Sequence, residues 1–329
     1  MAKYALTRIL WTIPMVFAIF VIVFSITYFS PGDPVLTILS GEYTQEEYDI
    51  VAARMGLDKP YIVQVATRLW NVITKFDLGV SFFYDMPVTM LLQIRLPVSI
   101  KLSVIHIVMM MVIGIPLGII SALRRFSILD IFLTTMSLIL AAIPAYVLAL
   151  LGALLFGVIL RWLPITGLDT WKAWILPVFC SSGAGIASYT RMSRTTMLEV
   201  IRQDYIRTAR AKGLKENLVV MRHALKNCLI PLITILGAQI SRMFSGSIII
   251  ETIFAIPGVG MLLRTGINQR DYPVITGCVL VISALICTVN MCVDIAYAFI
   301  DPRIKARFIS TSKQKKVLNK MLGKQKEAV

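Results

Sequence analysis

Residues 96–123 read LPVSIKLSVIHIVMMMVIGIPLGIISAL, an apolar run that carries one charged side chain, Lys101. The hydrocarbon core of a bilayer is about 30 Å thick, and a helix needs about 20 apolar residues to cross it. This run exceeds that length, so it predicts a transmembrane helix.

The composition of the whole chain agrees with that prediction. Of its 329 residues, 57% are hydrophobic and 16% are charged, whereas about a quarter of the residues of a soluble protein are charged. The formal net charge of +15 would suggest nucleic acid in a soluble chain. In a membrane protein it reports which loops remain in the cytoplasm, so no nucleic-acid partner is expected.

The apolar runs predict an all-α integral membrane protein with six transmembrane helices. The fourth run is the weakest, because residues 181–185 read SSGAG and dilute its hydropathy. The six predicted spans are Ile9–Phe29, Leu96–Leu123, Ile131–Leu160, Trp174–Ser188, Leu229–Phe254 and Val274–Ile300.

The distribution of Lys and Arg predicts the orientation of these helices. Nine basic residues lie between Arg191 and Lys226, and nine more lie between Arg303 and Lys326. The segment 30–95 instead carries eight acidic residues against five basic ones, as expected of an exported loop. Both termini are therefore expected inside the cell.

Four regions follow from this topology. Residues 1–29 hold a short cytoplasmic N-terminus and a first span that we expect to be an uncleaved anchor, because no small-x-small cleavage pattern precedes Pro31. Residues 30–95 form an extracytoplasmic segment and residues 96–300 a five-helix core. A basic cytoplasmic tail occupies residues 301–329.

The extracytoplasmic segment is predicted to be helical from Thr44 to Met55 and from Tyr61 to Phe76. Its aromatic residues favour two interpretations equally. They form a docking surface for an external partner, or they anchor a scaffold at the membrane surface, where aromatic side chains concentrate.

Small residues recur every four positions inside three of the predicted spans. Such stripes let helix backbones approach closely in a membrane, so they predict a packed bundle. Whether they face this chain or a second subunit stays open. The stripes are Gly114 and Gly118; Ala149, Ala153 and Gly157; and Gly237, Ser241 and Ser245.

The cytoplasmic segment 191–227 contains a helix with both ends marked. Asp204 is a favoured N-cap residue, Lys212 suits the negative end of a helix, and Gly213 can adopt the left-handed conformation that terminates one. The pattern predicts a two-turn helix over 205–212, followed by an amphipathic run into the fifth span.

This basic helix has two interpretations. Basic residues attract anionic lipid, but that attraction needs no particular sequence. A short helix with defined ends and small residues is instead typical of a segment that docks into the groove of a partner protein.

The stretch from Asp204 to Gly213 reads DYIRTARAKG, and Ile230-Pro231 follows it. It resembles the cytoplasmic motif of permease subunits of binding-protein-dependent ABC transporters, in the dipeptide, oligopeptide and nickel branch. The nominal motif begins Glu-Ala-Ala, whereas Arg207 and Thr208 stand at its first two positions here and the spacer is longer.

Six further motifs, in order along about 300 residues, resemble the same branch. They are Pro31-Gly32-Asp33-Pro34, Gly56-Leu57-Asp58-Lys59-Pro60, Asp77-Leu78-Gly79-Val80-Ser81, Glu251-Thr252-Ile253-Phe254 with Pro257-Gly258, Asp271-Tyr272-Pro273 and Asp301-Pro302-Arg303.

The resemblance implies the fold of a type I importer permease in a bacterial inner membrane. It implies a second homologous permease, two ABC ATPase subunits and an extracytoplasmic substrate-binding protein as partners, besides membrane lipid. The chain has no G-x-x-x-x-G-K-[ST] loop for phosphates. No catalytic residue and no cofactor are therefore expected in this chain, and ATP and magnesium would be held by the ATPase subunits.

In that family the short cytoplasmic helix couples the ATPases to the pore. Ala209, Ala211 and Gly213 would permit close approach of the partner, while Arg207, Arg210 and Lys212 would pair with its acidic residues. The coupling residues carried over from the motif are Asp204, Tyr205, Ile206, Arg207, Thr208, Ala209, Arg210, Ala211, Lys212 and Gly213.

Ionisable residues inside spans are candidates for the translocation path, because an unpaired charge is costly there. Arg242 lies midway along the fifth span, Glu251 near its outer end and Asp294 in the sixth. The alternative for Arg242 is a structural pair, either with Asp294 or with a partner subunit. Lys101 and His106 are interpreted as interfacial or helix-packing groups.

The sequence disfavours two functions other than that of an importer. A stand-alone ion-coupled carrier is disfavoured, because such proteins show paired acidic residues and inverted repeats that this sequence lacks. An intramembrane enzyme is disfavoured, because His106 and His223 form no catalytic motif. Within the family the expected substrate is a di- or oligopeptide, with nickel or a metal chelate as the alternative, and no metal site is expected in the chain.

Overall fold

The computed structural model describes residues 2–39 and 43–300, and within them the side chains of 2–9, 241–247 and 294–300 are among those outside the description. The described chain is helical throughout. In order, the elements are α1 (Ala2–Phe29), α2 (Pro34–Ile38), α3 (Gln45–Met55), α4 (Tyr61–Lys75), α5 (Val88–Leu123), α6 (Ile128–Ala142), α7 (Ala145–Gly152), η1 (Ala153–Ile159), η2 (Trp171–Trp174), α8 (Ile175–Val200), α9 (Asp204–Ala211), α10 (Glu216–Leu218), η3 (Val219–Ala224), α11 (Leu225–Ile253), α12 (Val259–Asn268) and α13 (Tyr272–Ile300).

Three helices of the described chain are long and apolar enough to cross a membrane, within α1, α5 and α13. A fourth candidate arises if α6 and the helical segment Ala145–Ile159 count as one broken span. The predicted fourth and fifth spans lie in the long helices α8 and α11. The structure therefore confirms an all-helical, multi-span chain, while the count of six stays a prediction.

The predicted third span, Ile131–Leu160, is not the single continuous helix that we expected. α6 ends at Ala142, and the next helical segment begins at Ala145 with a bend of 99°. Pro144 causes the break, since proline lacks a backbone N–H and disfavours helical backbone in the residue before it. Ile143 is accordingly extended, with φ −83° and ψ 122°.

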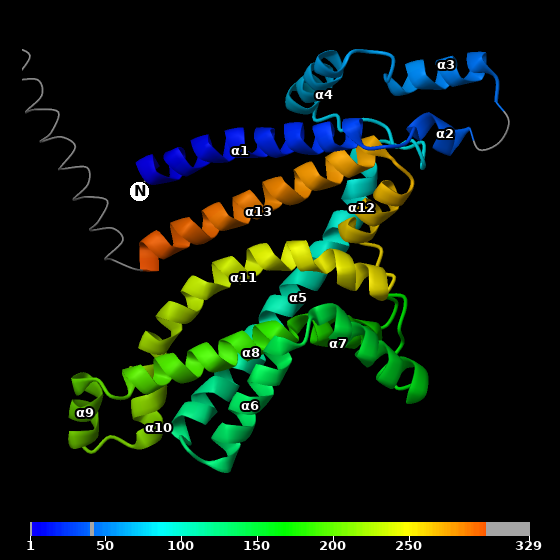
Figure 1. The fold of residues 1–329 in the computed structure, drawn as a ribbon. Helices are drawn as coiled ribbons and strands as arrows, with labels where there is room; N and C mark the ends of the chain where they lie inside the picture. The colour runs from blue at the N-terminus through cyan, green and yellow to red at the C-terminus, as the bar shows by residue number, and fades with distance from the viewer. Residues whose placement is uncertain (1, 40–42, 301–329) are drawn as a thin grey trace, which may run out of the picture.

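The helices pack in a layered bundle (Figure 1). α1 and α13 lie side by side, α5 crosses behind the bundle, and α8 packs along α5, α6 and α11. The start of α1, the end of α13 and α9 lie toward the left of the view, whereas α2, α3 and α12 lie toward the right. The short helix α9 and the helices α2 and α3 are thus at opposite ends of the molecule.

The first small-residue stripe faces this chain's own α8. A Cβ atom added to Gly118 would lie 2.3 Å from the Thr190 carbonyl oxygen, and one added to Gly114 would lie 2.6 Å from the Tyr189 Cβ. Both glycines are therefore required for the close approach of α5 to α8. In the second stripe, Ala149 and Ala153 are also buried inside this chain.

Both helices predicted within residues 30–95 are present, as α3 and α4. α3 begins with a capping box, in which Thr44 and Glu47 satisfy each other's backbone N–H groups, and ends at Gly56 with φ +69°. α4 packs on the end of α1 through Tyr61, whose hydroxyl lies 2.6 Å from the Ser25 Oγ.

Two motifs that are far apart in the sequence meet beside the start of α5. The Ser81 hydroxyl donates to Asp271 Oδ2 at 2.5 Å, and the Phe83 N–H donates to the same oxygen at 3.1 Å. Both Ser81 and Asp271 are almost completely buried. The loop before α5 is thereby fastened to the turn before α13.

Candidate functional site

The helix α9 has the predicted length, but its first turn differs from the prediction. Asp204 is the first helical residue rather than the N-cap, and Gln203, with extended backbone, precedes it without a side-chain cap. The Asp204 carboxylate still lies at the positive end of the helix, where it is favourable. Gly213 follows the helix with φ +77°, a conformation that non-glycine residues rarely adopt, as predicted.

One face of α9 is fixed to this chain. Ile206 and Ala209 are buried in a cluster that includes Val219 and Ala224 of η3. We expected Ala209 to admit a partner protein, and this is wrong, because its side chain points into its own bundle. The exposed residues of the motif are Asp204, Tyr205, Arg207, Thr208, Arg210, Ala211, Lys212 and Gly213.

The turn after α9 is tied by an ion pair. Arg210 donates from Nε to Glu216 Oε2 at 3.0 Å and from Nη2 to Oε1 at 2.6 Å. The guanidinium lowers the pKa of the Glu216 carboxyl through these hydrogen bonds. Arg210 therefore already has an internal partner, whereas Lys212 is exposed beside it.

A second ion pair connects the C-terminal part of α8 to the start of α6. Arg194 donates from Nε to Asp130 Oδ1 at 2.7 Å and from Nη2 to Oδ2 at 2.8 Å. The Ser121 hydroxyl and the Phe126 N–H also donate to the Asp130 carboxylate. Sequence reasoning missed this residue, although Ser127-x-x-Asp130 before an apolar run is a helix-start signal. The helix that leads into α9 is thus anchored to its neighbour.

Of the three path candidates, the structure describes the side chain of Glu251. Arg242 and Asp294 belong to α11 and α13, and their side chains lie outside the described residues. Glu251 is completely buried and accepts hydrogen bonds from the Ser99 hydroxyl at 2.7 Å and the Gly260 N–H at 2.7 Å. These contacts hold the start of α12, and a role of Glu251 in the path stays a prediction.

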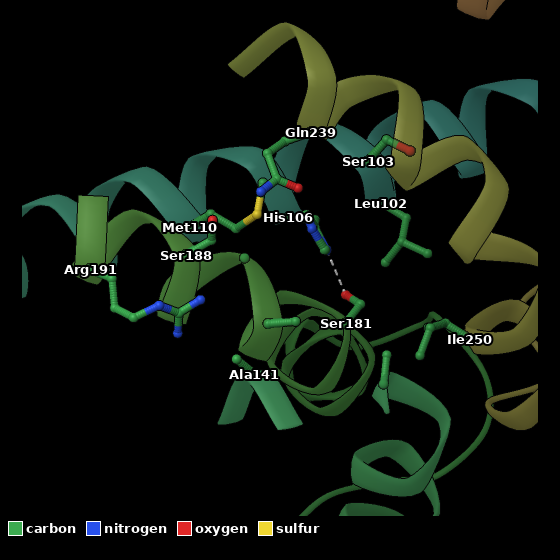
Figure 2. Close-up of a pocket in the computed structure, with 13 residues that line it drawn as sticks. Leu102, Ser103, His106, Met110, Ala141, Ser181, Ser188, Arg191, Gln239 and Ile250 are labelled. Carbon is green, nitrogen blue, oxygen red and sulfur yellow. Dashed lines mark hydrogen bonds between the residues drawn. The ribbon is translucent and has the colours of Figure 1, made fainter. Parts of the chain in front are cut away.

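A cavity of about 410 Å³ opens among α5, α8, α11 and the break between α6 and α7. His106 and Ser181 form a hydrogen bond of 2.8 Å on its wall (Figure 2). We interpreted His106 as an interfacial or packing group, and its place on a cavity wall was not anticipated. The lining residues are Leu102, Ser103, His106, Met110, Ala141, Ala145, Ser181, Ala184, Gly185, Ser188, Arg191, Gln239 and Ile250.

Lys101 packs on an aromatic ring, and three of the cysteines are buried within the described chain. Lys101 lies 4.5 Å from the centroid of the Trp174 ring, a cation–π contact that agrees with a packing role. Within residues 2–39 and 43–300, no three His, Cys, Asp or Glu side chains gather as a metal site. The thiols of Cys180, Cys228 and Cys278 are free and buried.

Comparison with known proteins matches two family models. Residues 114–306 match the binding-protein-dependent transport system inner membrane component, and residues 1–103 match the N-terminal part of such membrane components. Together these models cover most of the chain.

Full-length relatives are similar over nearly their whole length. A putative peptide transport system permease protein of Brucella abortus is 37% identical over 313 residues, covering 93% of this chain and 99% of the relative. The oligopeptide transport system permease protein AppB of Bacillus subtilis is 37% identical, with 93% and 100% covered. The glutathione transport system permease protein GsiC of Pectobacterium atrosepticum is 36% identical, with 93% and 99% covered.

A solved structure shares the fold. A chain of the MetNI methionine ABC transporter in an inward-facing conformation superposes with a TM-score of 0.56, covering 65% of this chain and 97% of that one. The sequence identity is 18%, so this likeness concerns the fold alone.

Proposed function

Because the chain belongs to the family of binding-protein-dependent transport system inner membrane components, we propose that it forms half of the pore of an ATP-driven importer for di- or oligopeptides. Family membership makes it a multi-pass membrane subunit rather than an enzyme. The peptide assignment is supported by the relatives, whose names refer to peptide, oligopeptide and glutathione transport. A second, homologous permease would form the other half.

The observation that carries the coupling mechanism is the construction of α9. Its inner face is packed into the bundle, its outer face is exposed, and the ion pair of Arg210 with Glu216 fixes its C-terminal turn. A helix held in this way can transmit a push as a rigid body. Arg207 and Lys212 remain on the exposed face for acidic residues of an ATPase subunit.

The force would pass from α9 into α8 and then into α6. Arg194 lies near the end of α8 and binds Asp130 at the start of α6. Movement of α9 by closing ATPases would therefore shift at least two helices together. Alternating access then requires only that ATP-bound ATPases bind the outward-open bundle more tightly than the inward-open one.

The arrangement of the helices agrees with a topology of six spans in which both termini lie inside the cell. The start of α1 and the end of α13 lie on the same side as α9, and the extracytoplasmic helices α2 and α3 lie opposite (Figure 1). α8 and α11 would supply the two further spans. Their polar residues would be tolerated because they face other helices or the cavity instead of lipid.

The extracytoplasmic helix α4 favours the membrane-surface interpretation of its segment. Ile62, Trp70 and Ile73 are exposed, as is Phe76 just after the helix. An exposed apolar face with an aromatic residue is typical of a helix that lies in the bilayer interface. The more polar α3 would remain available to the substrate-binding protein.

The experiment that tests the proposal is purification of the tagged full chain from native membranes in mild detergent, followed by mass spectrometry. We expect two P-loop ATPases and a second permease with the wild type. The variant Arg207→Glu/Lys212→Glu should lose the ATPases and retain the second permease. Lys59→Glu/Lys75→Glu, the same charge reversal on the extracytoplasmic segment, is the matched control and should retain all partners.

The energy source separates the importer from the carrier. Uptake into vesicles should be stopped by vanadate, which inhibits ABC ATPases, and should survive an uncoupler. A chain that purifies alone and moves substrate in a gradient-dependent manner would refute the importer.

A further inference from the structure

The cavity among α5, α6, α7, α8 and α11 has the volume and the polar lining of a small-molecule binding site. Its volume, about 410 Å³, lies within the range of about 300–1,000 Å³ that is typical of small-molecule pockets. Five of its lining side chains have hydrogen-bonding groups without a formal charge, namely Ser103, His106, Ser181, Ser188 and Gln239.

One polar group on the wall lacks a partner. The Ser103 side chain is 4% exposed, and its hydroxyl makes no hydrogen bond within the described part of the chain. A buried hydroxyl without a partner costs about 1–3 kcal/mol. A ligand that offers a hydrogen bond at this position would remove that cost.

The backbone supplies a second polar feature at the helix break. Ala141 and Ala145, on either side of Pro144, both line the cavity. Pro144 provides no side-chain cap, and its carbonyl accepts from the N–H groups of Val147 and Leu148. Ala145, the first residue of α7, thus brings the N-terminal end of the helix to the cavity, and such an end carries partial positive charge.

The formal charge on the cavity wall is positive and is carried by Arg191. Arg191 extends toward the cavity from α8 and donates from Nη1 to the Ser137 carbonyl at 2.9 Å, which leaves further guanidinium N–H groups available (Figure 2). No Asp or Glu is among the lining residues that the structure describes. Such a wall favours a carboxylate and disfavours an isolated amine or a metal cation.

We propose that this cavity is a transient substrate site within the single permease, which binds a small carboxylate-bearing solute such as a short peptide. The carboxylate would lie against Arg191, and the peptide body would contact Ser103, the His106–Ser181 pair and Gln239. This inference rests on the proposed function, because it gives the pore a site of its own that is separate from the external binding protein.

The broken helix gives such a site a physical reason to exist. Irregular backbone is tolerated at membrane depth where it is buried in protein or lines a cavity. The break at Pro144 puts irregular backbone beside the cavity, because Ala141 and Ala145 on either side of it belong to the lining. The helix break, the Ser103 hydroxyl and the Arg191 guanidinium thus all belong to the lining of one cavity.

The test is equilibrium binding of radiolabelled trialanine to the whole transporter complex in nanodiscs, without the binding protein. We expect saturable binding in the millimolar range or tighter. Trialanine with an amidated C-terminus should compete at least about tenfold more weakly, since a charge-assisted hydrogen bond is lost. This comparison uses the wild-type protein, so folding does not affect it.

Paired variants locate the site. Ala141→Phe fills the cavity and should abolish binding, whereas Ala142→Phe, at the next position and outside the lining, should not change it. Arg191→Gln should weaken binding at least about tenfold, while Arg124→Gln, an exposed arginine on the α5–α6 turn, should leave it unchanged.

Three results would overturn the proposal. They are no saturable binding in the millimolar range, equal competition by the amidated peptide, and wild-type binding by Ala141→Phe. Copurified ATPases and vanadate-sensitive uptake together with any of these results would refute this inference alone. Absence of the ATPases would instead refute the proposed function.

Discussion

Asp130 and Arg194 form a two-hydrogen-bond ion pair, with N–O distances of 2.7 and 2.8 Å, that joins the start of α6 to the C-terminal half of α8. The Asp130 side chain is 4% exposed and that of Arg194 is 25% exposed. The pair is therefore largely shielded from water, and neither charge can be removed without leaving the other without its counter-charge.

Asp130→Asn should lower the free energy of unfolding by about 3 kcal/mol, because it leaves the Arg194 guanidinium buried without its counter-charge. Asp130→Asn/Arg194→Leu, which removes both charges, should recover part of that loss. Thermal unfolding of the purified chain, followed by tryptophan fluorescence, measures both.

The control for this pair is Asp204→Asn. The Asp204–Arg207 pair is exposed at 3.7 Å, so its loss should change stability by less than about 0.5 kcal/mol. Equal losses for Asp130→Asn and Asp204→Asn would contradict the assignment.

Gly118→Ala should destabilise the chain by about 1–3 kcal/mol, because the new Cβ atom would overlap the α8 backbone at Thr190. Gly183→Ala is the matched control, since its Cβ atom would meet only the ends of the Leu148 and Leu140 side chains, at 3.0 and 3.8 Å. The same unfolding measurement compares the two, and an equally tolerated Gly118→Ala would show that α5 and α8 can separate at little cost.

Gly213→Val should destabilise the end of α9 by about 1 kcal/mol or more through backbone strain alone. The residue has φ +77°, and a Cβ atom there would meet nothing within 4 Å, so no clash contributes. Gly213→Asn should cost less, since asparagine tolerates this conformation better. Hydrogen exchange of the α9 amides should be faster in the valine variant than in the asparagine variant.

Glu251→Gln tests whether this carboxylate holds α12. Both of its oxygens accept hydrogen bonds, Oε1 from the Ser99 hydroxyl and Oε2 from the Gly260 and Met261 N–H groups. An amide keeps one accepting oxygen, so we expect a loss of about 2 kcal/mol and faster hydrogen exchange at residues 259–261. Unchanged exchange together with reduced uptake would assign Glu251 to the substrate path instead.

The Arg210–Glu216 pair predicts a pH dependence for the turn after α9. Arg210 lowers the pKa of Glu216 below its ordinary value of 4.5. The contribution of the ion pair to the stability of the turn is therefore fully present above about pH 5, and it is lost as the pH falls through the lowered pKa of Glu216. Hydrogen exchange at residues 211–215, corrected for the intrinsic rate, should increase only below pH 4.5, and Glu216→Gln should remove that increase.

Much of the architecture was predictable because the bilayer constrains it. Span length follows from membrane thickness. The side of each loop follows from the distribution of Lys and Arg and stays a prediction. The helices α3, α4 and α9 were predictable because turn residues such as Gly56 and Gly213 mark their ends. These are local signals that single residues carry.

The rest depended on contacts that no local pattern encodes. An eight-residue helix gives too little periodicity to tell which face is buried, so Ala209 was assigned to the wrong face. His106 and Ser181 are separated by 75 positions, and neither belongs to a motif. Pro144 marks the break in the sequence, but the apolar run continues across it, so hydropathy alone predicts one continuous span.

The buried bond between Ser81 and Asp271 also has a consequence for biosynthesis. Translation proceeds at about 5–20 residues per second, and 190 positions separate the two residues, so Asp271 is made roughly 10–40 s after Ser81. During that interval the loop before α5 lacks its hydrogen bond to Asp271. The loop is therefore fastened only when the turn before α13 has been made, and a nascent chain that stalls earlier leaves Ser81 without this partner.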